Sequence, residues 1–290
     1  MILDGKKIAA EIQREIKEKI QKLQSRPPCL AVVLTGRHPP SQIYVRRKTE
    51  ACKDVGIDSI KILLPEETTE EALLAKIAEL NENPAIDGIL VQLPLPAHIN
   101  PTRITYFISP EKDVDGFNPY NVGKILIGET DGFLPCTPFG IKVLIERYSI
   151  DISGRHALVI GRSNIVGKPM AALLMQGTPG GNATVTVAHR YSNDLKKYCL
   201  LADIIIVAVG QPGLITADMV SEGAVVIDVG INKITDSAKK EGYRIVGDVD
   251  FENVAPKCSY ITPVPGGVGP MTIAMLLYNT LHAYEKRMKN

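Results

Sequence analysis

Ala-Leu-Val-Ile-Gly-Arg-Ser-Asn-Ile-Val-Gly-Lys-Pro, residues 157–169, is the stretch that decides the fold. Its first four residues are apolar and predict a short buried strand, and the segment from Lys168 onward predicts a helix. The turn between them presents backbone N–H groups at a helix N-terminus, where the helix dipole favours an anion. The stretch therefore predicts a phosphate-binding turn. Its spacing departs from the usual G-x-G-x-x-G pattern, because Ser163 replaces the second glycine and Gly167 comes one residue late.

Short apolar strands alternate with helices on both sides of this turn. The expected helices are 6–24, 41–55, 70–80, 140–148, a segment from 168 and 195–201, and the expected strands are 30–34, 59–64, 86–93, 157–160, 184–187, 204–209 and 225–229. This alternation predicts an α/β fold built from parallel βαβ units, with ligand groups at the carboxyl ends of the strands.

The chain is long enough for two α/β domains with a cleft between them. We expect boundaries near Pro138 and Pro265. The apolar segment 271–284 is long enough to pack back on the first unit, so the first domain is predicted to comprise 1–138 plus 271–290 and the second 139–270.

Composition excludes several classes of partner. The 290 residues carry a formal net charge of +1 without a long basic run, which argues against nucleic acid and against an anionic membrane surface. The five cysteines are scattered and never spaced as C-x-x-C, so reduced thiols are expected rather than disulfides or a zinc ribbon. No apolar run reaches membrane-spanning length and no signal peptide is evident, so we predict a cytoplasmic protein.

The second strand of the later unit ends in Ala188-His189-Arg190. A dinucleotide site that prefers an unphosphorylated ribose has a carboxylate there. Arg190, helped by Arg162, could instead pair with a 2′-phosphate, so NADP is preferred over NAD. The alternative is that both arginines are ordinary solvated side chains. A nucleoside triphosphate loop fits worse, because Pro169 stands where a magnesium-binding hydroxyl would be.

Gly210 and Gly230 each follow an apolar strand. A glycine there lets the main chain pass close to a flat cofactor, and a simple turn explains it equally well.

The first unit carries a candidate catalytic group. Tyr44 and Lys48 are four residues apart in an expected helix and so share one face. Gln92 falls at a strand end in Val-Gln-Leu-Pro-Leu-Pro, residues 91–96, and the loop 113–117 supplies two carboxylates. A lysine on a helix is usually a solvated charge. The strand-end glutamine favours a site instead. The histidines are isolated, and no metal is required.

The run 261–272, Ile-Thr-Pro-Val-Pro-Gly-Gly-Val-Gly-Pro-Met-Thr, combines three prolines with three glycines before an apolar helical segment. Glycines remove side chains where something approaches the backbone, and prolines restrict the loop. A ligand cradle is favoured over a rigid structural turn.

Taken together, Tyr44-x-x-x-Lys48, the 91–96 motif and the 263–272 loop resemble the bifunctional methylenetetrahydrofolate dehydrogenase/cyclohydrolase family. Three further segments match in order along nearly the whole chain: Asp113-Val114-Asp115-Gly116, Pro135-Cys136-Thr137-Pro138 and Gly161-Arg162-Ser163-x-x-Val166-Gly167.

The resemblance implies a catalytic, folate-binding first domain, a Rossmann-like NADP-binding second domain, and a homodimer joined through the cofactor domains. It implies that Lys48 is the acid/base, that Gln92 assists it, and that Tyr44 and Asp115 position the folate. The folate pocket would also be lined by Val91, Leu93, Pro265, Gly266, Gly267, Val268 and Gly269. The cofactor would be held by Gly161, Arg162, Ser163, Arg190 and Ile231.

The implied activity is oxidation of 5,10-methylenetetrahydrofolate with NADP, followed by hydrolysis of the methenyl product to 10-formyltetrahydrofolate, within one-carbon metabolism and purine biosynthesis. Hydride transfer needs mainly positioning, whereas hydrolysis needs proton transfer, which Lys48 can supply when neutral. Three alternatives stay open: a monofunctional dehydrogenase, a non-catalytic NADP-sensing module, and a dehydrogenase of another small substrate of the amino-acid or shikimate type.

Overall fold

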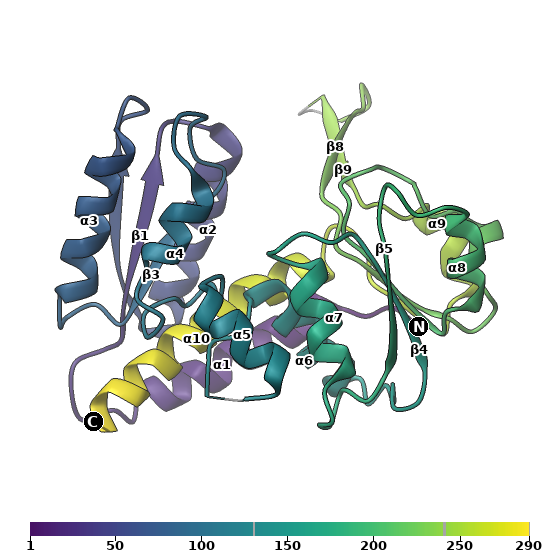
Figure 1. Ribbon diagram of the computed structural model, residues 1–290, viewed down its shortest axis with the longest axis horizontal. Coiled ribbons are helices and arrows are strands. Elements are labelled where there is room, and N and C mark those ends of the chain that lie inside the picture. Colours follow the sequence, from purple (N-terminus) through teal and green to yellow (C-terminus); the bar gives the residue numbers. More distant parts are fainter. Residues whose placement is uncertain (130, 240–241, 290) are drawn as a thin grey trace. The chain divides into compact units, whose positions relative to one another are not determined.

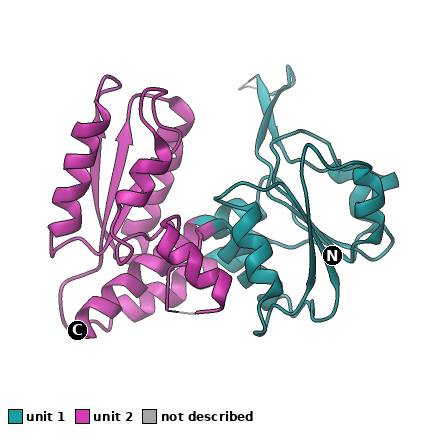
Figure 2. Ribbon diagram, viewed as in Figure 1, with its two compact units in different colours: residues 1–9, 137–272 teal, residues 10–136, 273–290 magenta. Residues whose placement is uncertain are grey.

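The computed structural model describes residues 1–129, 131–239 and 242–289. The chain forms two compact units (Figure 2). Unit 1 comprises residues 1–9 and 137–272, and unit 2 comprises residues 10–136 and 273–290.

Unit 2 contains a three-stranded parallel sheet in the order β2-β1-β3. Figure 1 labels β1 and β3 of this sheet. The strands are β1 (Cys29–Thr35), β2 (Asp58–Leu64) and β3 (Gly88–Val91). The helices with most of their residues in this unit are α1 (Gly5–Ile20), α2 (Pro39–Val55), α3 (Glu70–Glu82), α4 (Pro101–Phe107), α5 (Pro119–Ile127) and α10 (Val268–Lys289). The expected strands and helices are confirmed in type. β3 is shorter than predicted, and α4 and α5 were not predicted.

Unit 1 contains a five-stranded parallel sheet in the order β10-β7-β6-β4-β5. Its strands are β4 (His156–Ile160), β5 (Thr184–Ala188), β6 (Ile204–Val207), β7 (Val225–Asp228) and β10 (Tyr260–Ile261), and its helices include α6 (Cys136–Arg147), α7 (Gly167–Met175), α8 (Leu195–Leu201) and α9 (Phe251–Val254). An antiparallel hairpin of β8 (Asn232–Thr235) and β9 (Tyr243–Val246) was not predicted. The predicted α/β class with parallel sheets is confirmed.

The first nine residues group with unit 1. Ile2 forms a parallel bridge with Ile261, and the Leu3 N–H donates to the Ile261 carbonyl over 2.8 Å. The Lys6 N–H donates to Gly266 over 3.0 Å. The reason is backbone pairing: the N-terminal segment satisfies main-chain groups alongside β10, which amphipathic periodicity does not reveal.

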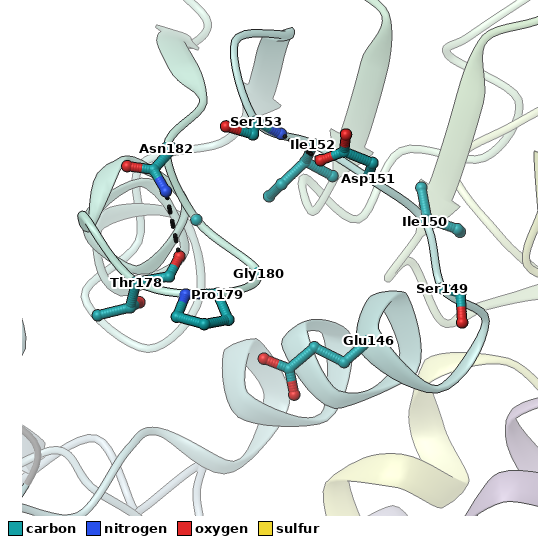
Figure 3. A pocket seen from close by; sticks show the side chains of 11 residues that line it. Glu146, Ser149, Ile150, Asp151, Ile152, Ser153, Thr178, Pro179, Gly180 and Asn182 are labelled. Atoms are coloured by element: carbon teal, nitrogen blue, oxygen red, sulfur yellow. Dashed lines mark hydrogen bonds between the residues drawn. The ribbon is translucent and has the colours of Figure 1, made fainter.

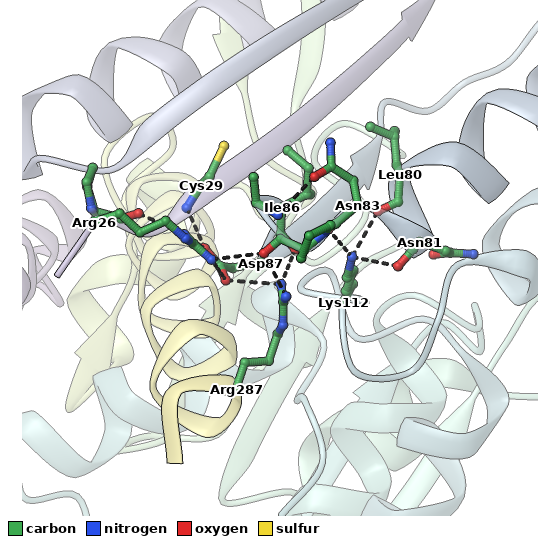
Figure 4. A network of polar contacts seen from close by, with 12 residues as sticks. Arg26, Cys29, Leu80, Asn81, Asn83, Ile86, Asp87, Lys112 and Arg287 are labelled. Atoms are coloured by element: carbon green, nitrogen blue, oxygen red, sulfur yellow. Dashed lines mark hydrogen bonds and ion pairs between the residues drawn. The ribbon is translucent and has the colours of Figure 1, made fainter. Parts of the chain in front are cut away.

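Asp87, directly before β3, anchors the last turns of α10 (Figure 4). Its fully buried carboxylate accepts two hydrogen bonds from Arg26, at 2.7 and 2.8 Å, and one from the Cys29 N–H at 2.8 Å. Arg287 of α10 adds a contact of 3.2 Å. A buried carboxylate with two guanidinium partners and a backbone donor is well compensated, so it fixes the position of α10 in unit 2.

Thr35, at the end of β1, gives a prediction of stability. It is 3% exposed, and its Oγ1 has no hydrogen-bond partner within the described ranges. Thr35→Val removes an unsatisfied buried hydroxyl at nearly constant volume and is expected to raise the free energy of unfolding by about 1 kcal/mol. Denaturant unfolding measures the change. Thr280→Val is the matched control, because the Thr280 hydroxyl is buried but donates to Leu276 over 2.8 Å, and that substitution is expected to destabilise. A loss of stability in Thr35→Val would contradict the prediction.

Candidate active site and cofactor site

Lys48 and Gln92 lie together in unit 2. The helix α2 begins with Pro39 and Pro40 in its first turn, where proline is tolerated, and ends at Gly56 in the left-handed conformation. Gln92 follows β3 and is held by its N–H, which donates to Val33 over 2.9 Å. The half-buried Lys48 Nζ donates to Gln92 Oε1 over 3.1 Å. The predicted pairing of these two side chains is therefore present at the carboxyl end of the sheet.

The Gln92 side chain is fixed at both ends. Its Oε1 accepts from Lys48, and its Nε2 donates to the Leu93 carbonyl over 2.6 Å. The neighbouring Leu93–Pro94 peptide is cis. Tyr44 is half-buried one turn before Lys48, on the same face of α2.

Asp115 belongs to the same group of side chains. Burial raises the pKa of its carboxyl, while the Lys48 ammonium and a hydrogen bond with the Cys136 thiol act in the opposite direction. Burial and the Asp115 carboxylate raise the pKa of the Cys136 thiol well above its usual value. An electrostatic pair of Lys48 and Asp115 next to an un-ionised thiol is suited to proton transfer and to holding a polar ring system.

Asp113 has a different role from Asp115. Its buried carboxylate accepts from the N–H groups of Phe117 and Asn118, at 3.2 and 2.8 Å, and from Asn121 Nδ2 at 2.9 Å. Burial raises the pKa of Asp113 to about 7. These contacts attach the loop to the start of α5, so Asp113 is structural.

Asn279 of α10 was missed by the sequence analysis. It is 2% exposed, and its Nδ2 donates to the carbonyls of Val114 and Leu134, at 2.8 and 3.0 Å. One amide thus ties the backbone just before Asp115 to the backbone just before Cys136. A lone asparagine in an apolar helical pattern was the only signal in the sequence.

The turn after β4 has the expected strand–turn–helix form. A Cβ on Gly167 would lie 2.1 Å from the Gly161 carbonyl oxygen, and one on Gly161 would lie 2.5 Å from that of Ala208. Both glycines are therefore required for close packing of β4, α7 and the neighbouring loop. Ser163 Oγ accepts from the Val166 N–H over 3.1 Å, so the serine organises the turn internally.

Arg162 and Arg190 both contact the Tyr191 ring. Their guanidinium carbons lie 5.7 and 4.8 Å from the ring centroid. Neither forms an ion pair within 1–129, 131–239 and 242–289, and both are exposed. Two uncompensated cations at the carboxyl ends of β4 and β5 fit a phosphate group.

Internal packing explains some of the glycines in the 263–269 loop, but not all of them. A Cβ on Gly267 would lie 2.7 Å from the Pro263 oxygen, and Gly5 packs directly against Gly267. Internal packing thus explains Gly267. A Cβ on Gly269 would meet no described atom within 4 Å, and Gly266 has φ +117°. Pro265 is exposed and Val268 is buried at the start of α10.

The segments that follow β6 and β7 contact a buried carboxylate, that of Asp248. A Cβ on Gly230 would lie 2.3 Å from Asp248 Oδ1, so this glycine is needed for internal packing. Gly210 has φ +70° and only a distant neighbour, Asn232 Oδ1 at 3.9 Å from the position of a Cβ. Ile231 is 51% exposed.

A separate hollow of about 360 Å³ lies in unit 1 between the end of α6 and the loop after α7 (Figure 3). None of the predicted binding residues lines it. It is lined by Glu146, Ser149, Ile150, Asp151, Ile152, Ser153, Thr178, Pro179, Gly180, Gly181 and Asn182. Across the part of the chain that the structure describes, no three His, Cys, Asp or Glu side chains gather as a metal ion would require, and no helix has the length and apolarity to cross a membrane.

Two family models match the chain. The catalytic domain of tetrahydrofolate dehydrogenase/cyclohydrolase matches residues 3–115, and the NAD(P)-binding domain of the same family matches residues 135–288. The bifunctional protein FolD of Protochlamydia amoebophila is 72% identical over 286 residues, which cover 99% of this chain and 98% of that protein.

Solved structures agree. The bifunctional FolD methylenetetrahydrofolate dehydrogenase/cyclohydrolase of Campylobacter jejuni is 52% identical, with a TM-score of 0.93 and 99% of each chain covered. The Trypanosoma brucei enzyme, solved with NADP cofactor and inhibitor, is 39% identical, with a TM-score of 0.94 over 100% of this chain and 99% of that one. The chain belongs to the tetrahydrofolate dehydrogenase/cyclohydrolase family.

Proposed function

We propose that this chain oxidises 5,10-methylenetetrahydrofolate to the methenyl form with NADP and hydrolyses the product to 10-formyltetrahydrofolate. The observation that carries the proposal is the Lys48 Nζ to Gln92 Oε1 contact of 3.1 Å, with Asp115 in electrostatic contact with Lys48. A monofunctional dehydrogenase or a cofactor sensor would have no use for this arrangement.

The residues present in unit 1 fit NADP. Gly161, Arg162 and Ser163 form the turn at the start of α7, and Arg190 adds a second cation for the 2′-phosphate. When bound, NADP supplies a hydride acceptor. The protein's part in this step is orientation, since the folate nitrogens themselves stabilise the developing cation.

Hydrolysis makes greater demands on side chains. Water attacks the methenyl carbon and loses one proton, which leaves a hydroxyl on that carbon. The bond from this carbon to one ring nitrogen then breaks: the nitrogen gains a proton, and the hydroxyl loses its proton as the formyl C=O forms. The Lys48 amine, once it has given up its proton, donates one N–H to Gln92 Oε1, and its lone pair takes the proton of the attacking water. Gln92 orients the amine without adding charge, and Asp115 holds the pterin with Tyr44 beside it.

Other residues are predicted to contact the ligands. The folate is predicted to contact Val91, Leu93 and the segment Pro265 to Gly269, and the cofactor is predicted to contact Ile231. The catalytic domain is predicted to comprise residues 1–138 and 271–290, and the NADP-binding domain residues 139–270. The family resemblance implies a cytoplasmic homodimer joined through the cofactor domains. It also implies that the product is used in purine biosynthesis.

The test supplies methylenetetrahydrofolate with NADP or NAD and follows reduced cofactor and methenyl product together. The proposal requires cofactor reduction with NADP preferred, followed by enzyme-dependent decay of the methenyl absorbance. Cofactor reduction without accelerated methenyl decay would favour the monofunctional alternative. Absence of tetrahydrofolate binding in a titration would favour the sensing module.

A further inference from the structure

Asp248, after β9, connects two strand-end segments of unit 1. It is completely buried. Its Oδ2 accepts from the N–H groups of Val209 and Gly210, at 2.8 and 2.9 Å, and its Oδ1 accepts from Asn232 Nδ2 at 2.8 Å. The first two donors follow β6, and the third begins β8. One carboxylate therefore sets the separation of the loops after β6 and β7.

Asp228, the last residue of β7, holds Asp248 in turn. Its Oδ1 accepts from the N–H groups of Gly230 and Asp248, both at 2.9 Å, and its Oδ2 accepts from Val249 at 2.9 Å. A Cβ on Gly247 would lie 1.8 Å from Asp228 Oδ2, so only glycine fits there. Backbone N–H groups and one side-chain amide donate to the two carboxylates. Because each carboxylate oxygen has a fixed hydrogen-bond partner, the arrangement is rigid.

The segments held in this way present apolar side chains outward. Val209 is 40% exposed and Ile231 is 51% exposed, although both adjoin fully buried strands. Ile231 lies between Gly230, bonded to Asp228, and Asn232, bonded to Asp248. In parallel α/β sheets, ligands bind at the carboxyl ends of the strands, which is where these two side chains stand.

We infer that Asp248 is a positioning residue for the dehydrogenase step: through Val209, Gly210 and Asn232 it fixes the apolar edge formed by Val209 and Ile231 against the flat, uncharged part of the cofactor. This inference rests on the proposed cofactor role of Ile231. It assigns no part to Asp248 in hydrolysis, because hydrolysis consumes no hydride acceptor.

An exchange of partners tests the inference. In Asp248→Asn, the amide oxygen can accept from Val209 and Gly210, but its NH₂ then faces the NH₂ of Asn232. The two NH₂ groups then face each other with no acceptor between them. We therefore expect the dehydrogenase kcat/KM for NADP to fall roughly tenfold or more. Cyclohydrolase activity on supplied methenyltetrahydrofolate should stay within about twofold of the unaltered protein.

Asn232→Asp alone places two carboxylates in contact and is also expected to lower kcat/KM. The double variant Asp248→Asn/Asn232→Asp restores a donor opposite an acceptor, and it should recover most of the lost kcat/KM. A double variant no better than the worse single one would overturn the inference. So would equal losses of dehydrogenase and cyclohydrolase activity, which indicate general damage to the fold.

Two further variants keep the result interpretable. Asn232→Ala leaves the bonds of Asp248 to Val209 and Gly210 intact, so it reports on the Ile231 segment even if Asp248→Asn does not fold, and an unchanged KM for NADP in it would count against the inference. Ile231→Ala tests the underlying assignment. If it leaves the KM for NADP unchanged, the proposed cofactor contact of Ile231 is wrong; if it raises that KM while Asp248→Asn does not, the positioning role alone fails.

Discussion

Lys48→Met is expected to abolish cyclohydrolase turnover while folate binding stays detectable. Methionine keeps much of the apolar stem of lysine but has no amine to take a proton from water, and a positioned acid/base group contributes roughly 10²- to 10⁴-fold. Hydride transfer requires no base, so dehydrogenase activity is expected to fall much less. Following the decay of supplied methenyltetrahydrofolate, beside the spontaneous rate without enzyme, gives the measurement.

Lys53→Met is the matched control for this variant. Lys53 lies on the same helix, five residues later, but is exposed and near its C-terminal end. It should hydrolyse the methenyl substrate at the unaltered rate. Lys48→Arg separates charge from proton transfer, because a guanidinium retains the positive charge but stays protonated. Ring opening at the normal rate in Lys48→Met would remove Lys48 from the acid/base role.

The contact of Lys48 with Gln92 could be predicted because each partner carries a local signal. Lys48 shares a helix face with Tyr44, and Gln92 directly follows an apolar strand that parallel topology places beside β1. Strand ends of one parallel sheet collect at one edge, so two local patterns sufficed to bring the side chains together.

Other features depend on partners far along the chain. The first residues pair with Ile261, and nothing in their own sequence distinguishes them from the start of an amphipathic helix. The strands of the β8–β9 hairpin are four residues each, so an alternating pattern over them is too short to recognise. Asn279, Asp228 and Asp248 are buried polar residues whose hydrogen-bond partners are mostly main-chain groups. Sequence patterns record side-chain polarity, not the backbone groups that satisfy it.

Glycines illustrate the same limit. Gly230 was considered a place for close approach of a flat cofactor or a turn, whereas the structure fills the space above it with the Asp248 carboxylate. Gly167 came one residue late for the usual pattern, and it is needed because the Gly161 carbonyl lies against it. A missing side chain shows that space is needed there, but only the fold shows what fills it.

Arg190→Ala is expected to raise the KM for NADP roughly 10- to 100-fold and to leave the KM for NAD nearly unchanged. A charge-assisted hydrogen bond contributes about 1.5–3 kcal/mol, and about 1.4 kcal/mol corresponds to a tenfold change in affinity. The 2′-phosphate is the group by which the two cofactors differ, so the loss should be confined to NADP. Initial rates of methylenetetrahydrofolate oxidation at varied NADP and NAD concentrations give both constants.

Arg162 and Arg190 share a contact with the Tyr191 ring, so the controls have to separate the contributions of the two arginines. Because Arg162 and Arg190 both contact this ring, Arg190→Ala could also shift Arg162, and Arg162→Ala measures that second contribution. Arg190→Lys keeps the charge but loses the bidentate geometry, so its KM for NADP should lie between those of the unaltered protein and Arg190→Ala. Lys197→Ala removes an exposed cation of α8 and should alter neither constant. Equal increases in the KM for NADP and NAD would refute phosphate recognition, since a contact to the shared part of the cofactors affects both alike.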